Sequence, residues 1–218
     1  MAAPIRISEL SCHYGRLRAL TSVSTTIPTG TTTALVGANG SGKSTLLAVM
    51  AGTKKMSSSR IEGLPRNVAF VVQRSAVPDR LPITVREAVE MGRWRRRGLL
   101  GRLDGHDRSV VDGALEDLGI QDLAGRQLGE VSGGQRQRAL IAQGLAQQAE
   151  LLLLDEPLAA VDEETALRIE TTIRRQRAAA VTVVLATHDI EQAARADRVI
   201  RLDGGTIAND GVTGRPAA

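Results

Sequence analysis

The sequence predicts an α/β fold in which a mainly parallel sheet lies between layers of helices. Several short segments, such as "TTTALV" (31–36) and "ELLLLD" (150–155), are rich in apolar or β-branched residues on both faces. Segments with helical periodicity follow several of them, as expected for strands joined by crossover helices. The predicted strands are 5–10, 22–27, 31–36, 67–72, 150–155, 181–187 and 198–202. The predicted helices are 43–50, 84–91, 107–118, 132–147, 163–179 and 189–195, with Thr84 and Ser132 as N-caps.

Length and composition limit the class of protein. The chain has 218 residues, 42% hydrophobic and 24% charged, which suffices for one domain with a buried core. No apolar run approaches the ~18 residues of a membrane helix, and "MAAPIRISEL" lacks the pattern of a secretion signal, so we expect a cytosolic chain. The single cysteine, Cys12, cannot form an internal disulfide and is expected to be a buried thiol.

The net charge of +4 raises the question of a nucleic-acid partner. Aromatic residues make up only 1% of the chain (Tyr14, Phe70 and Trp94), so stacking surfaces for single strands are missing. Much of the positive charge lies in "GRWRRRGLLGR" (92–102). We therefore expect no nucleic-acid partner, and the basic run requires a local explanation.

A helical segment interrupts the α/β pattern. Between the predicted strands that end near residue 72 and begin near residue 150 lie roughly 75 residues with only helix and loop signals, too many for an ordinary connection. We expect a single domain with a core at about 1–75 and 148–218 and a helical subdomain at about 76–147. "KKMSSSR" (54–60) is expected to be an exposed loop, and the tail "TGRPAA" a frayed end.

A glycine-rich phosphate loop joins a predicted strand to a predicted helix. "ALVGANGSGKST" (34–45) contains the pattern G-x-x-x-x-G-K-S from Gly37 to Ser44, whose backbone N–H groups can converge on phosphate oxygens. Lys43 is expected to reach the β and γ phosphates, and the Ser44 hydroxyl to hold Mg²⁺. The residues predicted to bind ATP here are Gly37, Asn39, Gly40, Ser41, Gly42, Lys43, Ser44 and Thr45.

Polar side chains at three other strand ends suit ATP hydrolysis. "LLLLDEPLAAVD" places Asp155 and Glu156 side by side, where alternation along a strand directs them to different places. Asp155 is expected to organise Mg²⁺, and Glu156 to orient and deprotonate the attacking water. His188 follows "VTVVLAT" and is expected to contact the γ phosphate. Gln73 closes "VAFVVQ" and is a candidate for contact with Mg²⁺ or that water.

A second glycine pair lies far from the phosphate loop, in "VSGGQ" (131–135). Ser132, Gly133, Gly134 and Gln135 open a predicted helix, and bare N–H groups at the positive end of a helix dipole suit an anion. Together with "GANGSGKS", Gln73, "LLLLDE" and His188, in this order, the segment resembles the ATP-binding subunit of ABC transporters over essentially the whole chain. The resemblance implies a P-loop NTPase of the ABC ATPase type, with an antiparallel β portion and an inserted helical subdomain.

The resemblance also implies how the parts act together. In that family the signature serine and glycines face the γ phosphate of ATP held by a second subunit, so two chains placed head to tail complete two sites. Tyr14 is similar to the aromatic residue that stacks on adenine, the alternative being a partly buried tyrosine at a strand end. Asp162 matches the aspartate that links the two sites. Leu158 departs from the usual serine or threonine after "DEP", which bears on the geometry of that loop.

The segment 73–97 bears on the transported cargo. "QRS", followed by a helix like "TVREAVEMGRW", resembles the zinc and manganese uptake ATPases, with iron-chelate importers less similar. We expect partners in integral membrane permease subunits and, indirectly, an extracytoplasmic metal-binding protein, at the inner face of the cell membrane. An iron-chelate importer, an exporter and a nontransport ABC ATPase are the alternatives. The basic run 93–97 is expected to be either a membrane-side surface or a solvated charged face.

Overall fold

The chain divides into two compact units. The computed structural model describes residues 3–56, 58–73, 82–97 and 101–213. The first unit consists of Met1–Phe70, Glu150–Glu156 and Gln176–Ala218, and the second of Val71–Ala149 and Pro157–Arg175. The segment Pro157–Arg175 thus groups with the helical unit, although it lies inside the 148–218 segment of the expected core.

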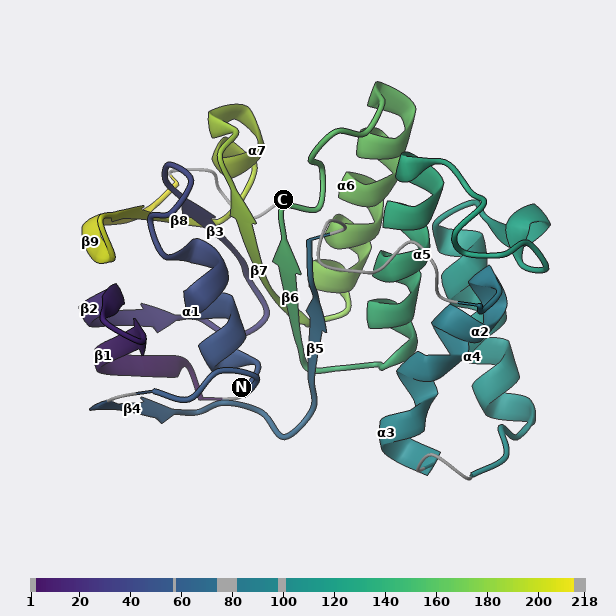
Figure 1. Cartoon of the computed structure of the whole chain (residues 1–218), viewed down its shortest axis with the longest axis horizontal. Coiled ribbons are helices and arrows are strands. Elements are labelled where there is room, and N and C mark those ends of the chain that lie inside the picture. The colour runs from purple at the N-terminus through teal and green to yellow at the C-terminus, as the bar shows by residue number, and fades with distance from the viewer. Residues whose placement is uncertain (1–2, 57, 74–81, 98–100, 214–218) are drawn as a thin grey trace. The chain divides into compact units, whose positions relative to one another are not determined.

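The larger sheet confirms the predicted α/β class. Its strand order is β5-β6-β7-β3-β8-β9 (Figure 1). The four strands β6, β7, β3 and β8 are parallel, and β9 adds an antiparallel edge. Every residue of β6 and β7 is buried, as predicted for central strands covered on both faces. The bounds are β3 (Thr32–Val36), β5 (Val68–Val71), β6 (Leu151–Asp155), β7 (Thr182–Thr187), β8 (Arg198–Asp203) and β9 (Thr206–Val212).

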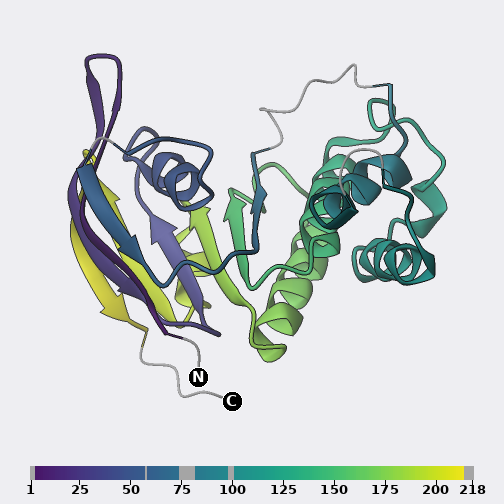
Figure 2. The ribbon, with the colours of Figure 1, turned by 90° about the horizontal axis from the view of Figure 1, so that it is seen from below.

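A smaller antiparallel sheet has the order β2-β1-β4. Its strands are β1 (Ile5–Tyr14), β2 (Leu17–Ile27) and β4 (Ser58–Glu62). Figure 2 shows that the β1–β2 hairpin extends well past the end of β4. The prediction of a loop over 54–60 is wrong for its last residues, which belong to β4. Backbone pairing of β4 with β1 outweighs the polar composition of that segment. The strand β9 was not predicted either.

The core of the first unit surrounds α1 (Lys43–Met50). This helix contacts β6 and β7 of the larger sheet and β2 of the smaller one, as Figure 1 shows. Leu46, Leu47 and Met50 of α1 are buried in one cluster with apolar residues of both sheets. Cys12 is fully buried in this cluster, as predicted, and its Sγ atom lies 3.6 Å from the carbonyl oxygen of Lys55.

The second unit is mainly helical. Helices α2, α4 and α5 pack against one another. Thr84 and Ser132 are N-caps, as predicted, and each also forms a reciprocal capping box. None of the helices within the described residues is long and apolar enough to cross a lipid bilayer. The helices of this unit are α2 (Val85–Glu90), η2 (Met91–Arg93), α3 (Trp94–Arg97), α4 (Gly105–Asp117), η3 (Gln121–Leu123) and α5 (Gly133–Ala146). Helix α6 (Glu163–Ala178) begins in this unit and its last residues are counted with the first, which also contains α7 (Ile190–Ala194).

The basic run 93–97 does not form one charged surface. Arg95 and Arg96 are exposed, but Arg93 is only 2% exposed and its Nη2 atom lies 3.0 Å from Oδ1 of Asp107. Both expectations for the run, a membrane-side surface and a solvated face, are therefore wrong for Arg93. The physical reason is that a buried carboxylate on α4 draws the guanidinium inward, which periodicity along the chain does not reveal.

Candidate ATP site

The phosphate loop connects β3 to α1, and its glycines are required by close packing. A Cβ atom at Gly37 would clash with the carbonyl oxygen of Leu202 and lie 2.5 Å from Oγ of Ser41. Gly42 has φ of 105°, and a Cβ there would lie 2.7 Å from Leu20 Cδ2. The loop can follow this path only with glycine at both positions. Its backbone N–H groups are thereby held at the start of an eight-residue helix.

Lys43 lies inside this loop. Its side chain is buried, and its Nζ atom donates hydrogen bonds to the carbonyl oxygens of Gly37 (2.7 Å) and Ala38 (3.0 Å). The ammonium group therefore stays at the centre of the loop. The Oγ atom of Ser41 is buried and has no hydrogen-bond partner among the described residues. A buried hydroxyl without a partner, in a loop that also holds a buried cation, fits an anionic ligand such as a phosphate chain.

Ser44 and Asp155 come together from opposite parts of the sequence. The Ser44 hydroxyl donates a hydrogen bond of 3.0 Å to Oδ1 of Asp155 at the end of β6. Burial raises the pKa of Asp155, as does the charge of Glu156, while the Ser44 bond and the Lys43 charge oppose the shift. A hydroxyl and a carboxylate supply the hard oxygen ligands that Mg²⁺ prefers. A bound cation would also offset the free-energy cost of burying the charged carboxylate of Asp155. The residues present fit Mg²⁺.

Glu156 and His188 form a second pair at the ends of adjacent strands. The Nδ1 atom of His188 lies 3.7 Å from Oε1 of Glu156, and their side chains are 65% and 15% exposed. The Glu156 amide donates to the carbonyl oxygen of Ala186 in β7. Glu156 has φ of 48°, a left-handed conformation that costs a non-glycine residue about 1–3 kcal/mol. As predicted, Asp155 and Glu156 point to different partners.

Tyr14 ends β1 and is 48% exposed. The Nζ atom of Lys54 lies 3.7 Å from the centroid of its ring, a cation–π contact. Lys54 was missed from the sequence, because no motif connects the loop after α1 with the end of β1. The ring is thus partly exposed, with Lys54 over one of its faces.

The signature segment (Ser132–Gln135) and Asp162 lie together in the second unit. The Gln135 amide donates to Oγ of Ser132, and the Ser132 amide donates to Oε1 of Gln135. A Cβ at Gly134 would lie 3.6 Å from Oδ2 of Asp162. The Asp162 carboxylate accepts a hydrogen bond from the Thr165 amide, which lowers its pKa. Ser132 is exposed, so the start of α5 is open to an anion.

The predicted site residues thus fall into two groups. The first unit holds the phosphate loop, Thr45, Tyr14, Asp155, Glu156 and His188, and the second holds the signature segment, Asp162 and Gln73. Asn39 and Gly40 are exposed at the tip of the phosphate loop. Gln73 follows β5 and is half-buried.

Comparison with known proteins decides the family. The family model for ABC transporters matches residues 20–159, which include the phosphate loop, the signature segment and Glu156. The chain belongs to the ABC transporter family. It is 35% identical to the zinc transport system ATP-binding protein TroB of Treponema pallidum (strain Nichols), over 97% of this chain and 82% of TroB.

Two further matches agree with this assignment to the ABC transporter family. The manganese transport system ATP-binding protein MntB of Halalkalibacterium halodurans is 30% identical over 94% of this chain and 84% of MntB. A dimeric structure of the ATP-binding cassette MJ0796 in a post-hydrolysis state, bound to ADP and Pi, has a TM-score of 0.85 and 25% identity. That match covers 97% of this chain and 99% of the cassette. The chain is therefore an ABC transporter ATPase.

Proposed function

We propose that this ABC ATPase is the energy-coupling subunit of an importer for a divalent metal, either zinc or manganese. The observation that carries the proposal is the 35% identity to a zinc transport ATP-binding protein over 97% of the chain, with a manganese transport protein at 30%. An iron-chelate importer or an exporter would use the same ATP chemistry. A nontransport ABC ATPase is a more distant alternative.

The phosphate loop would hold the phosphates of ATP in the first unit. The Lys43 ammonium group, already held at the centre of the loop, would exchange its bonds with Gly37 and Ala38 for bonds to the β and γ phosphate oxygens. The exposed ring of Tyr14 would stack on adenine.

Hydrolysis would rely on Glu156 and His188. The Glu156 carboxylate would orient a water for in-line attack on the γ phosphorus and take its proton, while the bond to the β–γ bridging oxygen breaks. His188 would donate a hydrogen bond to a γ phosphate oxygen, and Gln73 would contact the same water. The short distance between His188 and Glu156 supports a shared task.

Mg²⁺ would be held by Ser44, Asp155 and Gln73. When bound, the ion would neutralise the negative charge of the β and γ phosphates. The Ser44–Asp155 bond and the raised pKa of Asp155 support a cation at these two residues.

A second ATPase subunit would complete each site. The signature segment of one copy would face the γ phosphate held by the other, with Asp162 linking the two sites. Both units of the chain would act as a single ABC ATPase domain. Permease subunits would hold the dimer at the inner face of the cell membrane, and an extracytoplasmic metal-binding protein would deliver the cargo. No nucleic acid is involved in this proposal.

The test is the metal content of cells grown under metal limitation. Zinc, manganese and iron are measured in cells that carry the wild-type chain, Glu156→Gln, or the exposed control Glu191→Gln. A selective fall in zinc or manganese with Glu156→Gln alone supports the proposal. A fall in iron alone would favour the iron-chelate alternative, and unchanged levels of all three would contradict metal import.

A further inference from the structure

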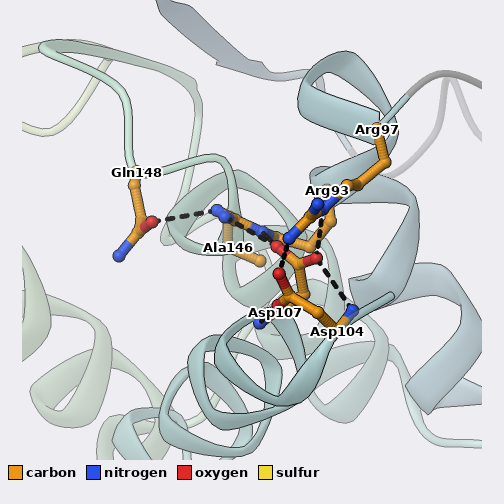
Figure 3. Close-up of polar contacts among 6 residues, drawn as sticks. All are labelled: Arg93, Arg97, Asp104, Asp107, Ala146 and Gln148. Atoms are coloured by element: carbon orange, nitrogen blue, oxygen red, sulfur yellow. Dashed lines mark hydrogen bonds and ion pairs between the residues drawn. The ribbon is translucent and has the colours of Figure 1, made fainter. Parts of the chain in front are cut away.

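A buried ionic cluster in the second unit joins three helices. Figure 3 shows Arg93 of η2 and Arg97 of α3 directed at Asp107 in the first turn of α4. The Nε atom of Arg93 lies 3.0 Å from Oδ1 of Asp107, and Nε of Arg97 lies 2.6 Å from Oδ2. The Asp107 side chain is completely buried. Burial opposes its charge, but the two guanidinium groups outweigh burial and lower the pKa of Asp107.

Among the hydrogen bonds of the described residues, Arg93 is bonded to the end of α5 and Arg97 is not. The Nη1 atom of Arg93 donates to the carbonyl oxygen of Ala146 at 2.6 Å and to Oε1 of Gln148 at 3.0 Å (Figure 3). Ala146 is the last residue of α5, where carbonyl groups lack partners within the helix. A cation also complements the negative end of the helix dipole. Arg93 therefore caps the C-terminus of α5.

The turn after α5 depends on this cap. Gln148 has φ of 49°, a left-handed conformation that usually requires glycine at the end of a helix. Arg93 holds the side chain of that residue. The neighbouring Gly92 brings its backbone close to the last turn of α5, because a Cβ there would clash with the carbonyl oxygen of Gln143 and lie 3.0 Å from Cβ of Ala146. Gly92 and Arg93 thus pack closely against the C-terminal end of α5.

The opposite end of α5 carries the signature segment. We propose that Arg93 is a positioning residue for ATP hydrolysis, which fixes α5 so that Ser132 is presented to the ATP of a second copy. This inference rests on the proposed head-to-tail dimer. Helix α5 has 14 residues, about 21 Å at 1.5 Å per residue. A tilt of roughly 3° at one end displaces the other by about 1 Å, enough to weaken a catalytic arrangement.

The structure offers a matched control at the same carboxylate. Arg97 pairs with Asp107 and Asp104, yet no described hydrogen bond joins it to α5. Arg93→Met and Arg97→Met therefore remove the same charge from the same cluster, and only the first removes the donor to Ala146 and Gln148. A role limited to neutralising the charge of Asp107 predicts similar effects on dimerisation for both changes, whereas a role in positioning α5 predicts different ones.

The experiment measures two equilibria in the Glu156→Gln background, which slows hydrolysis. ATP binding to the monomer is measured by calorimetry at low protein concentration, and ATP-dependent dimerisation by analytical ultracentrifugation. Arg93→Met should weaken dimerisation at least tenfold and leave monomer affinity within twofold. Arg97→Met should leave both within twofold. Equal dimerisation of Arg93→Met and the parent, or equal losses with Arg93→Met and Arg97→Met, would overturn the inference.

A double variant and a measurement of the parent guard against misfolding and against the absence of a dimer. If Arg93→Met does not fold, Arg93→Met with Asp107→Asn removes both charges of the pair and leaves Arg97 paired with Asp104. The same tenfold loss of dimerisation is expected, and dimerisation equal to that of the parent would overturn the inference. The Glu156→Gln parent is measured first. A parent that stays monomeric with ATP contradicts the proposed dimer itself, whereas a dimeric parent confines any failure to Arg93.

Discussion

The Nδ1 atom of His188 lies 3.7 Å from the Oε1 atom of Glu156, although 32 positions separate them in the chain (188 minus 156). Adjacent parallel strands β6 and β7 end beside each other and bring the pair together. The arrangement places a carboxylate and an imidazole, the usual acid–base groups of enzymes, at the sheet edge that also carries Asp155. Glu156 also has a left-handed backbone conformation, with φ of 48°, and such residues collect at functional sites.

Glu156→Gln should lower the ATPase rate by about 10²–10⁴-fold, because glutamine cannot accept the proton of the attacking water. ATP affinity should change little, since Glu156 does not belong to the phosphate loop. Phosphate release and nucleotide binding measure the two quantities. Glu191→Gln, on the exposed first turn of α7, serves as the control and should remain fully active. A Glu156→Gln variant with the wild-type rate would rule out this residue as the base.

His188→Ala should also reduce the ATPase rate, by about 10²–10³-fold, through loss of a hydrogen-bond donor to the γ phosphate. The side chain is 65% exposed, so its removal leaves no cavity and the melting temperature should stay unchanged. Steady-state kinetics and thermal melting test both statements. A large fall in melting temperature would instead indicate a structural histidine.

Asp155→Asn should weaken the dependence of ATP binding on Mg²⁺, because one of the three proposed ligands is lost, and should stabilise the chain without nucleotide. The pKa of Asp155 is raised in the folded state, so its ionised form opposes folding at pH above that pKa. The penalty shrinks as the pH falls through the folded-state pKa, where the carboxyl group of the folded chain takes up its proton, and it is gone below the lower pKa of the unfolded chain. The variant should melt higher at neutral pH, by about 2–4 °C for each kcal/mol gained.

Melting curves of Asp155→Asn and wild type across the acid range test whether the pKa of Asp155 is raised or lowered in the folded state. The difference in melting temperature should shrink as the pH is lowered below the folded-state pKa of Asp155. A difference that instead grows toward low pH would show that the pKa is lowered, and that the Ser44 bond dominates over burial.

Tyr14→Ala should weaken ATP binding by about 1–3 kcal/mol, roughly 5- to 150-fold, if the ring stacks on adenine. Tyr14→Phe keeps the ring and should bind ATP as the wild type does. Tyr14 is half exposed at the end of a hairpin, so neither change should destabilise the fold greatly. Equal affinity in the alanine variant would favour the alternative of a tyrosine with only a structural role.

The sequence predicts the central strands and the phosphate loop well, because these depend on local patterns. Buried runs such as β6, and glycines at Gly37 and Gly42, reflect local packing and backbone needs. The strand β4 was missed because its polar residues form a strand only through pairing with β1. Burial of Arg93 was missed for a similar reason, since its partner Asp107 lies on another helix. Contacts between distant segments leave no periodic signal in the chain.

The central claim is that each ATP site combines the phosphate loop of one copy with the signature segment of another. Two inactive variants test it directly: Lys43→Ala removes the cation of the loop, and Gly134→Asp places a carboxylate beside Asp162, where it would repel phosphate. Circular dichroism establishes that both are folded, and ATPase activity is then measured for each alone and for an equal mixture. The account predicts recovery toward about a quarter of the wild-type rate, because half of randomly paired dimers are mixed and each holds one complete site. A mixture no more active than its two components would contradict the claim.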